Sequence, residues 1–263
     1  MIYDDLTISK IKAPYFTVGG YLERDIPAPE ELLGDLFISP SLNMVAAGEG
    51  VGKSYLLLGM ARAIATGTPF LNLEAGVAKR VLYIDGEMDP NELQTRLGIL
   101  STKYRDVDKF INNTGIISFS DFTSLVPDFT DIRWQNHFAS IIEQHDVIMF
   151  DNLSSCLGET DLATDVKEVK RFINWCVSLR NQKGKSIFLV NHMTKTSKET
   201  MGVPQLKIFN NTNIELVRGE GNESKFVVTK CRHKPYYGKE GSYEMDFITV
   251  DGAVIYKSIH NDF

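Results

Sequence analysis

The segment 46–54 combines residue types and a spacing that can bind a phosphate chain. It contains the sequence Ala-Ala-Gly-Glu-Gly-Val-Gly-Lys-Ser, and it lies between an apolar run and a helix-forming run. Backbone N–H groups in such a turn, together with the positive end of the following helix, can bind phosphate oxygens. Lys53 can reach the β- and γ-phosphates, and the Ser54 hydroxyl can ligate Mg²⁺. The segment therefore predicts a P-loop with ATP and Mg²⁺ as its ligands.

The P-loop pattern has one departure, at its first glycine position, which Ala47 occupies. A methyl group is a small steric change, and the three glycines that follow keep the loop permissive. The alternative is a glycine-rich turn in which Lys-Ser occurs by chance. The candidate nucleotide contacts are Gly48, Glu49, Gly50, Val51, Gly52, Lys53, Ser54 and Tyr55.

A second part of the site is expected at Asp151, which ends the apolar run 146–150. A carboxylate at the tip of a buried strand can hold Mg²⁺ through its water shell, beside the hydroxyl of Ser54. An apolar run that ends in Asp is common and is often only structural. Its position after a P-loop favours the metal-site interpretation, which corresponds to a Walker B strand.

The residue after Asp151 is Asn152, where many P-loop ATPases have a water-activating Glu. Glu87 is the candidate base instead, because it follows the second predicted strand and because parallel strands bring their C-terminal ends to one sheet edge. Asp85 and Asp89 are rivals for this role. Asp89 precedes a proline and is more typical of a helix N-cap, and Asp85 is a candidate strand-end or supporting carboxylate.

Short apolar runs alternate with helical patterns along most of the chain. The predicted strands are 42–46, 80–85, 115–119, 146–150 and 186–191, and the predicted helices are 54–65, 90–100, 134–144 and 165–181. Nearly continuous apolar strands between helices indicate an α/β fold with a mostly parallel sheet covered on both faces. The runs 213–218, 225–230, 243–250 and 253–257 predict a C-terminal antiparallel β extension, with a hairpin at Asp251-Gly252.

The length of 263 residues fits one large domain. We expect an N-terminal segment at 1–38 and the ATPase domain at 39–263. The N-terminal segment is expected to cap the sheet, and the alternative is an arm that packs on a neighbouring subunit.

Composition excludes some functional classes. The net charge is −6, which argues against a uniformly basic nucleic-acid-binding surface but not against a local basic channel. The three cysteines lack metal-like spacing and predict reduced thiols. We see no signal peptide and no apolar run near the roughly 18 residues of a membrane span. The expectation is a cytoplasmic protein without a membrane partner.

Two further features extend the pattern. The run Phe188-Leu189-Val190-Asn191-His192 predicts a strand that ends in a polar pair, and Lys230-Cys231-Arg232 ends a later strand. Together with the P-loop, Glu87 and Asp151, these residues resemble the RecA-like P-loop ATPases. Within them, residues 30–240 resemble the plasmid-type RepA and DnaB group of hexameric replicative helicases.

The resemblance implies roles for these residues. His192 matches the histidine that senses the γ-phosphate in RepA-like proteins. Lys230 and Arg232 resemble the paired fingers that DnaB-like subunits insert into the ATP site of a neighbour, where a cation can accelerate phosphoryl transfer. The alternatives are a solvent-facing histidine beyond a strand and two surface cations on a β-edge.

The resemblance also implies that two loops face the channel of a ring. The first, 153–164, is acidic. The second begins after His192, and its Thr194, Lys195, Lys198 and Lys207 are the candidate contacts to single-stranded DNA. It lacks an aromatic residue between Lys195 and Lys207, so a flexible polar loop is the alternative.

The expected function is therefore an Mg²⁺-dependent ATPase that assembles as a homo-hexamer or another ring. It is expected to translocate on single-stranded DNA as a helicase, with other replication proteins as further partners. The alternatives are a RecA-like nucleotide switch or scaffold, and a recombinase-type filament.

Overall fold

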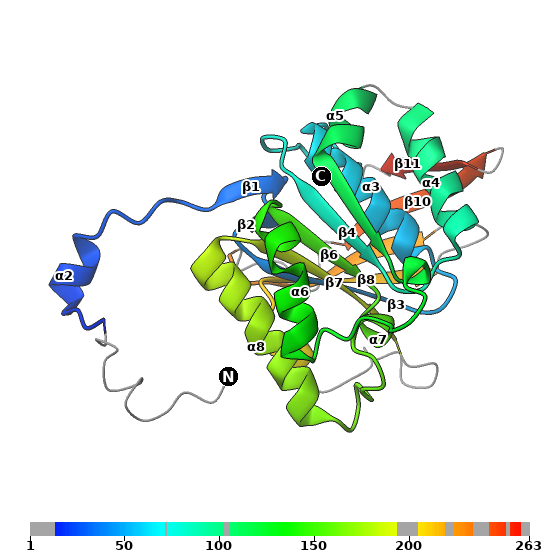
Figure 1. Ribbon diagram of the computed structural model, residues 1–263. Helices are drawn as coiled ribbons and strands as arrows, with labels where there is room; N and C mark the ends of the chain where they lie inside the picture. Colours follow the sequence, from blue (N-terminus) through cyan, green and yellow to red (C-terminus); the bar gives the residue numbers. More distant parts are fainter. Residues whose placement is uncertain are drawn as a thin grey trace.

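The computed structural model describes residues 14–71, 73–102, 106–193, 205–218, 224–233, 242–250 and 253–258. Its central feature is a nine-stranded sheet with the strand order β11-β10-β9-β8-β3-β7-β6-β4-β5 (Figure 1). The parallel strands are β3 (Leu42–Ala47), β4 (Val81–Asp85), β5 (Thr114–Ser118), β6 (Val147–Asp151), β7 (Ser186–His192) and β8 (Thr212–Arg218). The antiparallel strands are β9 (Ser224–Cys231), β10 (Ser242–Val250) and β11 (Ala253–Ser258). The predicted mostly parallel sheet with an antiparallel extension is confirmed.

Helices cover both faces of the parallel part of the sheet (Figure 1). On one face lie α3 (Lys53–Thr66), α4 (Pro90–Thr102) and α5 (Val107–Asn113), and on the other lie α6 (Ile132–Glu143), α7 (Leu153–Cys156) and α8 (Val166–Lys183). The central strands β3, β4, β6 and β7 are mostly apolar because alternate residues enter two cores. In β6, Val147 and Met149 pack with α3, whereas Ile148 and Phe150 pack with α6 and α8.

The predicted helix ends agree closely with the structure. Gly67 and Gly184 end α3 and α8 in the left-handed conformation, with φ of 69° and 64°. Val169, Phe172, Ile173 and Cys176 form the buried face of α8 against the core, and Cys176 is fully buried. The predicted strand end at residue 250 is also close, since Val250 pairs with Ala253. Asp251 and Gly252 themselves lie outside the described residues.

The N-terminal part of the described chain has two different surroundings. Strands β1 (Glu30–Leu33) and β2 (Phe37–Ser39) form a small separate sheet, and Leu33 and Phe37 are fully buried in the core that contains α3. Residues 14–29, which include α2 (Val18–Leu22), extend away from the domain in Figure 1. None of these described residues is buried, so the segment that packs on the core is 30–39.

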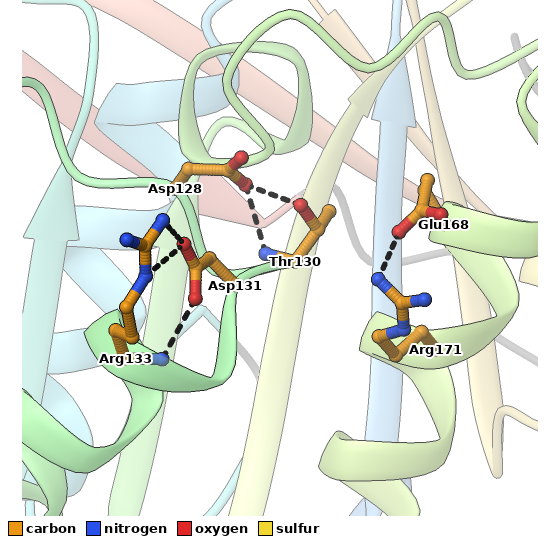
Figure 2. A network of polar contacts seen from close by, with 6 residues as sticks. All are labelled: Asp128, Thr130, Asp131, Arg133, Glu168 and Arg171. Carbon is orange, nitrogen blue, oxygen red and sulfur yellow. Dashed lines mark hydrogen bonds and ion pairs between the residues drawn. The ribbon is translucent and has the colours of Figure 1, made fainter. Parts of the chain in front are cut away.

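The loop between β5 and α6 is fastened by short polar contacts, which Figure 2 shows beside α8. Asp128 accepts hydrogen bonds from the backbone N–H and the hydroxyl of Thr130, at 2.8 and 2.7 Å. Asp131 caps α6 by accepting the N–H of Arg133. The N–H of Phe129 donates to the carbonyl of Cys156 at 3.0 Å. This loop therefore holds the short helix α7 against the end of β6.

Several short elements were not expected from the sequence. They are α2, α5, α7, α9 (Gln205–Ile208), the 3₁₀ turn Phe119–Asp121, and the β1–β2 sheet. Across the ranges that the structure describes, no helix has both the length and the apolar composition needed to cross a lipid bilayer.

Candidate nucleotide-binding and hydrolysis site

The C-terminal ends of four neighbouring parallel strands meet at one edge of the sheet. In the order β3-β7-β6-β4, Ala47 pairs with His192 and Asp151 pairs with Asp85. Glu87 follows two residues after the end of β4. The P-loop, His192, Asp151 and Glu87 are therefore brought together at this edge, as the strand order of an α/β sheet requires for a ligand site.

The P-loop joins β3 to α3 and has the backbone conformation that its glycines permit. Gly50 and Gly52 have φ of 69° and 98°, and Gly52 is the N-cap of α3. The first helical hydrogen bond runs from the N–H of Leu56 to the carbonyl of Gly52, at 3.0 Å. Ala47 is the last residue of β3, and its methyl group is buried in the core. The departure at this position thus lies in the strand and does not strain the loop.

Lys53 lies at the centre of the site with only 8% of its surface exposed. Its Nζ donates to the carbonyl of Gly48 at 3.0 Å and lies 3.3 Å from Nδ1 of His192. Burial lowers the pKa of Lys53, and the charges of Asp151 and Glu87 oppose this shift. An ammonium group held by a carbonyl inside the loop is positioned to meet phosphate oxygens.

Asp151 is 1% exposed, and its Oδ2 accepts a hydrogen bond from the hydroxyl of Tyr83. Burial raises the pKa of Asp151, while the Tyr83 and Ser54 hydroxyls oppose the rise. The second oxygen, Oδ1, has no hydrogen-bond partner among the described residues. A buried carboxylate oxygen without a partner, beside a serine hydroxyl, is a donor set that fits Mg²⁺.

The described residues contain no group of three or more His, Cys, Asp and Glu that could hold a metal ion by themselves. An ion at Asp151 and Ser54 would therefore take most of its ligands from water and nucleotide phosphates, as Mg²⁺ commonly does.

The two rival carboxylates have different surroundings. Asp89 accepts the N–H of Asn91 at 2.8 Å at the start of α4, which agrees with a helix cap. Asp85 is buried at the end of β4 and accepts the N–H of Met88 at 3.2 Å. Burial raises the pKa of Asp85 to about 6, although its hydrogen bond from Met88 opposes the rise. Asp85 thus supports the loop that carries Glu87.

Asn152 is a site residue that the sequence did not single out as functional. Its Nδ2 donates to Oε2 of Glu87 and lies 3.1 Å from Nε2 of His192. Gly86 permits this arrangement, because a Cβ there would lie 2.6 Å from Cβ of Ser155 in α7. The only sequence signal was the position of Asn152 directly after the Walker B carboxylate.

The ends of β8 and β9 also contact the P-loop, which local sequence patterns did not predict. Arg218 donates to the carbonyl of Gly50 at 3.0 Å, and the hydroxyl of Ser224 donates to the carbonyl of Val51 at 2.9 Å. These contacts join residues separated by about 170 positions, so only the tertiary fold reveals them. They hold the Gly50–Val51 part of the P-loop in place.

Tyr55 follows Ser54 in the first turn of α3, and its ring is partly buried. The guanidinium of Arg96 lies 4.0 Å from the centre of this ring, in a cation–π contact. Tyr55 therefore links the start of α3 to α4.

Lys230 and Arg232 are not brought to this site. Strand β9 runs antiparallel to β8, and Cys231 pairs with Thr212, the first residue of β8. The end of β9 thus lies at the sheet edge opposite the P-loop. There, Lys230 donates to the carbonyl of Ile208 at 2.9 Å, and Arg232 donates to the same carbonyl. Burial and the charge of Arg232 lower the pKa of Lys230.

The candidate DNA-contacting residues are mostly beyond the part of the chain that the structure describes. Thr194, Lys195 and Lys198 lie outside the described residues. Lys207 belongs to α9, but its side chain also lies outside the description. The first predicted channel loop, 153–164, begins with α7.

Comparison with known proteins shows the family to which the chain belongs. A family model described as an AAA domain matches residues 7–198. The DNA repair protein RadA from Synechocystis is 27% identical over 185 residues, which cover 68% of this chain and 32% of RadA. The chain thus spans about a third of that relative's length.

Two solved structures are similar in fold. The RadB recombinase superposes with a TM-score of 0.56 at 12% identity, over 81% of this chain and 89% of RadB. The ATPase domain of G40P superposes with a TM-score of 0.58 at 14% identity, over 82% and 84% of the two chains. This fold is that of the RecA-like P-loop ATPases.

Proposed function

Because the chain belongs to the AAA domain family and has a RecA-like fold, we propose that it is an ATP-driven motor acting on single-stranded DNA. In this proposal it assembles as a ring, most simply a homo-hexamer, and works as a replicative-type helicase. The observation that carries the proposal is the separation of two groups of residues. Lys53, Asp151 and Glu87 lie at one sheet edge, and Lys230 and Arg232 lie at the other.

This separation favours sites that are shared between subunits. A cation at that end of the strands lies away from the phosphates bound to its own P-loop, so in this proposal it acts on those bound by a neighbouring copy. Such a contact joins unlike surfaces of two copies, and a head-to-tail interface of this kind closes into a ring or continues as a filament. Lys230 and Arg232 would then stabilise charge on the transferred phosphoryl group.

Within one subunit, different residues of the chain have different roles in ATP binding and hydrolysis. Lys53 and the P-loop backbone bind the phosphates, and Glu87 orients water for in-line attack on the γ-phosphate. His192 contacts the γ-phosphate and responds to its loss. Ser54 and Asp151 would hold Mg²⁺, which supplies charge neutralisation at the phosphate oxygens when bound.

The proposed DNA contacts are Thr194, Lys195, Lys198 and Lys207, with backbone amides of the same loop. Cations and hydroxyls bind phosphates without reading base sequence, as a translocating motor requires. The similarity to RadA, a DNA repair protein, supports DNA as the polymer. Other replication proteins are the proposed partners for loading.

A recombinase-type filament is the second candidate, since one of the similar folds belongs to the RadB recombinase. Electron microscopy of the protein with ATP and single-stranded DNA separates the two. Closed rings support the helicase proposal, and open helical filaments support the recombinase alternative.

The first test is ATP hydrolysis with and without single-stranded DNA, at low salt and over a range of protein concentrations. We expect DNA to stimulate turnover, and we expect the specific activity to rise cooperatively as the protein associates. Lys195→Ala and Lys198→Ala should reduce the stimulation, whereas Lys183→Ala, at the exposed end of α8, should not. Slow hydrolysis that is indifferent to DNA and concentration would reject the motor and favour a nucleotide switch.

A further inference from the structure

A continuous chain of polar contacts runs through the candidate site. Asn152 Nδ2 donates to Glu87 and lies 3.1 Å from His192 Nε2, while His192 Nδ1 lies 3.3 Å from Nζ of Lys53. This series of contacts connects Glu87, the proposed base, with His192, the proposed sensor, and with Lys53 of the P-loop. Asn152 is the link between the first two.

The orientation of the Asn152 amide is determined by two independent contacts. Its Oδ1 accepts the backbone N–H of Ser155 at 3.2 Å, at the N-cap of α7. Its Nδ2 faces the carboxylate of Glu87, which can only accept when ionised. The oxygen and nitrogen of the amide therefore cannot be exchanged, and the second hydrogen of Nδ2 is directed at His192.

This orientation decides which ring nitrogen of His192 carries the proton. Burial and the charge of Lys53 lower the pKa of His192, so the ring is neutral near neutral pH. A neutral imidazole has one donor nitrogen and one acceptor nitrogen. Donors face both ring nitrogens, since Nδ2 of Asn152 lies 3.1 Å from Nε2 and Nζ of Lys53 lies 3.3 Å from Nδ1, and a neutral ring can accept from only one of them. The Asn152 contact is the shorter one and Lys53 also donates to Gly48, so we assign Nε2 as the acceptor and Nδ1 as the protonated nitrogen.

The Nδ1–H group then faces another donor, the ammonium of Lys53. Lys53 donates instead to the carbonyl of Gly48, so it has a partner without His192. The two donors, Nδ1 of His192 and Nζ of Lys53, lie 3.3 Å apart, so one acceptor atom can bind both of them. An oxygen of a terminal phosphate has the charge and lone pairs to accept from both.

We propose that Asn152 is a positioning residue that makes His192 a hydrogen-bond donor toward the γ-phosphate and couples this contact to Glu87. This inference rests on the proposed ATPase function and deepens it. ATP engages both donors, whereas ADP lacks the phosphate that His192 would contact. Asn152 therefore contributes to the preference for ATP over ADP, and it transmits loss of the phosphate from His192 to Glu87.

The test uses the full chain with ring-¹⁵N NMR of His192 near pH 8, without nucleotide. We expect the Nδ1–H tautomer in the wild type. Asn152→Asp keeps the shape of the side chain and a helix-cap acceptor but removes the donor, so the proton should move to Nε2. An Nε2–H tautomer in the wild type would overturn the proposal.

Binding measurements give a second readout. For Asn152→Asp and Asn152→Ser, which both retain a capping oxygen, the affinity for a nonhydrolysable ATP analogue should fall about fivefold to tenfold. Affinity for ADP should not change. His192→Ala should cause a similar selective loss, and combining it with Asn152→Ser should add little. Equal losses for both nucleotides, or additive effects, would reduce Asn152 to a structural cap.

These measurements need no DNA and no assembly, so they are separate from the motor test. An Nδ1–H tautomer with selective ATP loss would support the Asn152 role even if DNA failed to stimulate hydrolysis. Conversely, DNA-stimulated hydrolysis with an unaltered nucleotide preference in both variants would leave the motor proposal standing and reject the role of Asn152.

Discussion

Individual side chains at the P-loop edge differ in burial, and this difference suits them to different tasks. Asp151 is almost completely buried and fixed by Tyr83, whereas Glu87 is exposed and held through Asn152. A buried carboxylate with one unpartnered oxygen suits a metal ion, while an exposed carboxylate can reach water. This contrast supports the proposal that Glu87 is the base.

Glu87→Gln should retain ATP binding and lose hydrolysis by a factor of about 100 or more, because a carboxamide cannot act as a general base. The carboxamide oxygen can still accept from Asn152, so the loop should keep its position. The test measures both the rate of ATP hydrolysis and the affinity for ATP in this variant and in the wild type. Glu143→Gln on the exposed surface of α6 is the control and should hydrolyse normally; full turnover in the Glu87 variant would disprove the assignment.

The raised pKa of Asp85 predicts a dependence of stability on pH. Its folded-state pKa of about 6 exceeds the usual 3.8, so the folded protein binds the proton more tightly than the unfolded chain does. The stability contributed by this proton is present below pH 4 and is lost as the pH rises to 6. Above pH 6, the ionised Asp85 lowers the free energy of unfolding by at most about 3 kcal/mol, which corresponds to a shift of about two pKa units.

Asp85→Asn should remove this cost while still accepting the N–H of Met88. Relative to the wild type, the variant should gain about 1–3 kcal/mol in free energy of unfolding between pH 4.5 and 7.5. Urea denaturation with EDTA and without nucleotide measures it. Parallel pH profiles for the two proteins would show that Asp85 is not the titrating group.

At the scale of elements, the close approach of the β4 end to α7 depends on Gly86. An added Cβ would meet Ser155 at 2.6 Å, so Gly86→Ala should displace α7 and with it Asn152. We expect at least a tenfold loss of hydrolysis and a destabilisation of about 1–3 kcal/mol, the usual cost of overpacking. Gly98→Ala in α4 is the matched control, since nothing lies within 4 Å of its added Cβ.

Gly98→Ala should instead stabilise the protein by up to about 1 kcal/mol, because Ala has the higher helix propensity. Thermal or urea unfolding of the pair, measured beside turnover, separates the two glycines. Similar behaviour of both variants would contradict the argument from close packing.

The β8–β9 strand ends are a second element that acts on the site. Arg218→Ala removes the donor to the Gly50 carbonyl and should raise the KM for ATP about threefold to tenfold, because the loop loses a charge-assisted hydrogen bond of about 1 kcal/mol. Arg133→Ala, which removes the exposed partner of Asp131 in Figure 2, should leave KM unchanged. An unchanged KM for Arg218→Ala would mean that the P-loop needs no support from β8.

The sequence predicted the long elements and the sheet edge well, for a physical reason. Buried parallel strands are continuous apolar runs, and their ends must meet at one edge, so the positions of Glu87, Asp151 and His192 near the P-loop could be inferred. Their chemical roles remain predictions. The four-residue helix α7 could not be inferred, because so short a segment shows no helical period.

Contacts between distant segments were equally beyond the sequence patterns. The role of Asn152 depends on the approach of α7 to Gly86, and the role of Arg218 depends on the return of β8 to the P-loop. Neither approach has a local signature. Ala47 is a different case, because the sequence pattern suggested a departure within the P-loop, whereas the structure places Ala47 at the end of strand β3.

For the whole molecule, the position of Arg232 predicts complementation between defective subunits. Arg232→Ala and Lys53→Ala should each lose turnover. When the two variants are mixed in equal amounts, about one quarter of the interfaces would combine an intact P-loop with an intact Arg232, so part of the activity should return. The assay is ATP hydrolysis by the mixture beside each variant alone. Failure of any mixture to recover turnover, despite shown co-assembly, would argue against shared sites.

In the proposed assembly, each subunit would meet one neighbour through its P-loop and another through the Lys230–Arg232 end of β9, because these lie at opposite ends of the parallel strands. A copy altered only at its P-loop surface could still join an assembly through its β9 end, but no further copy could bind to it. Substoichiometric amounts of such a copy would act as a chain terminator. Rings and filaments would then respond differently, since a terminator leaves a filament short but prevents a ring from closing at all.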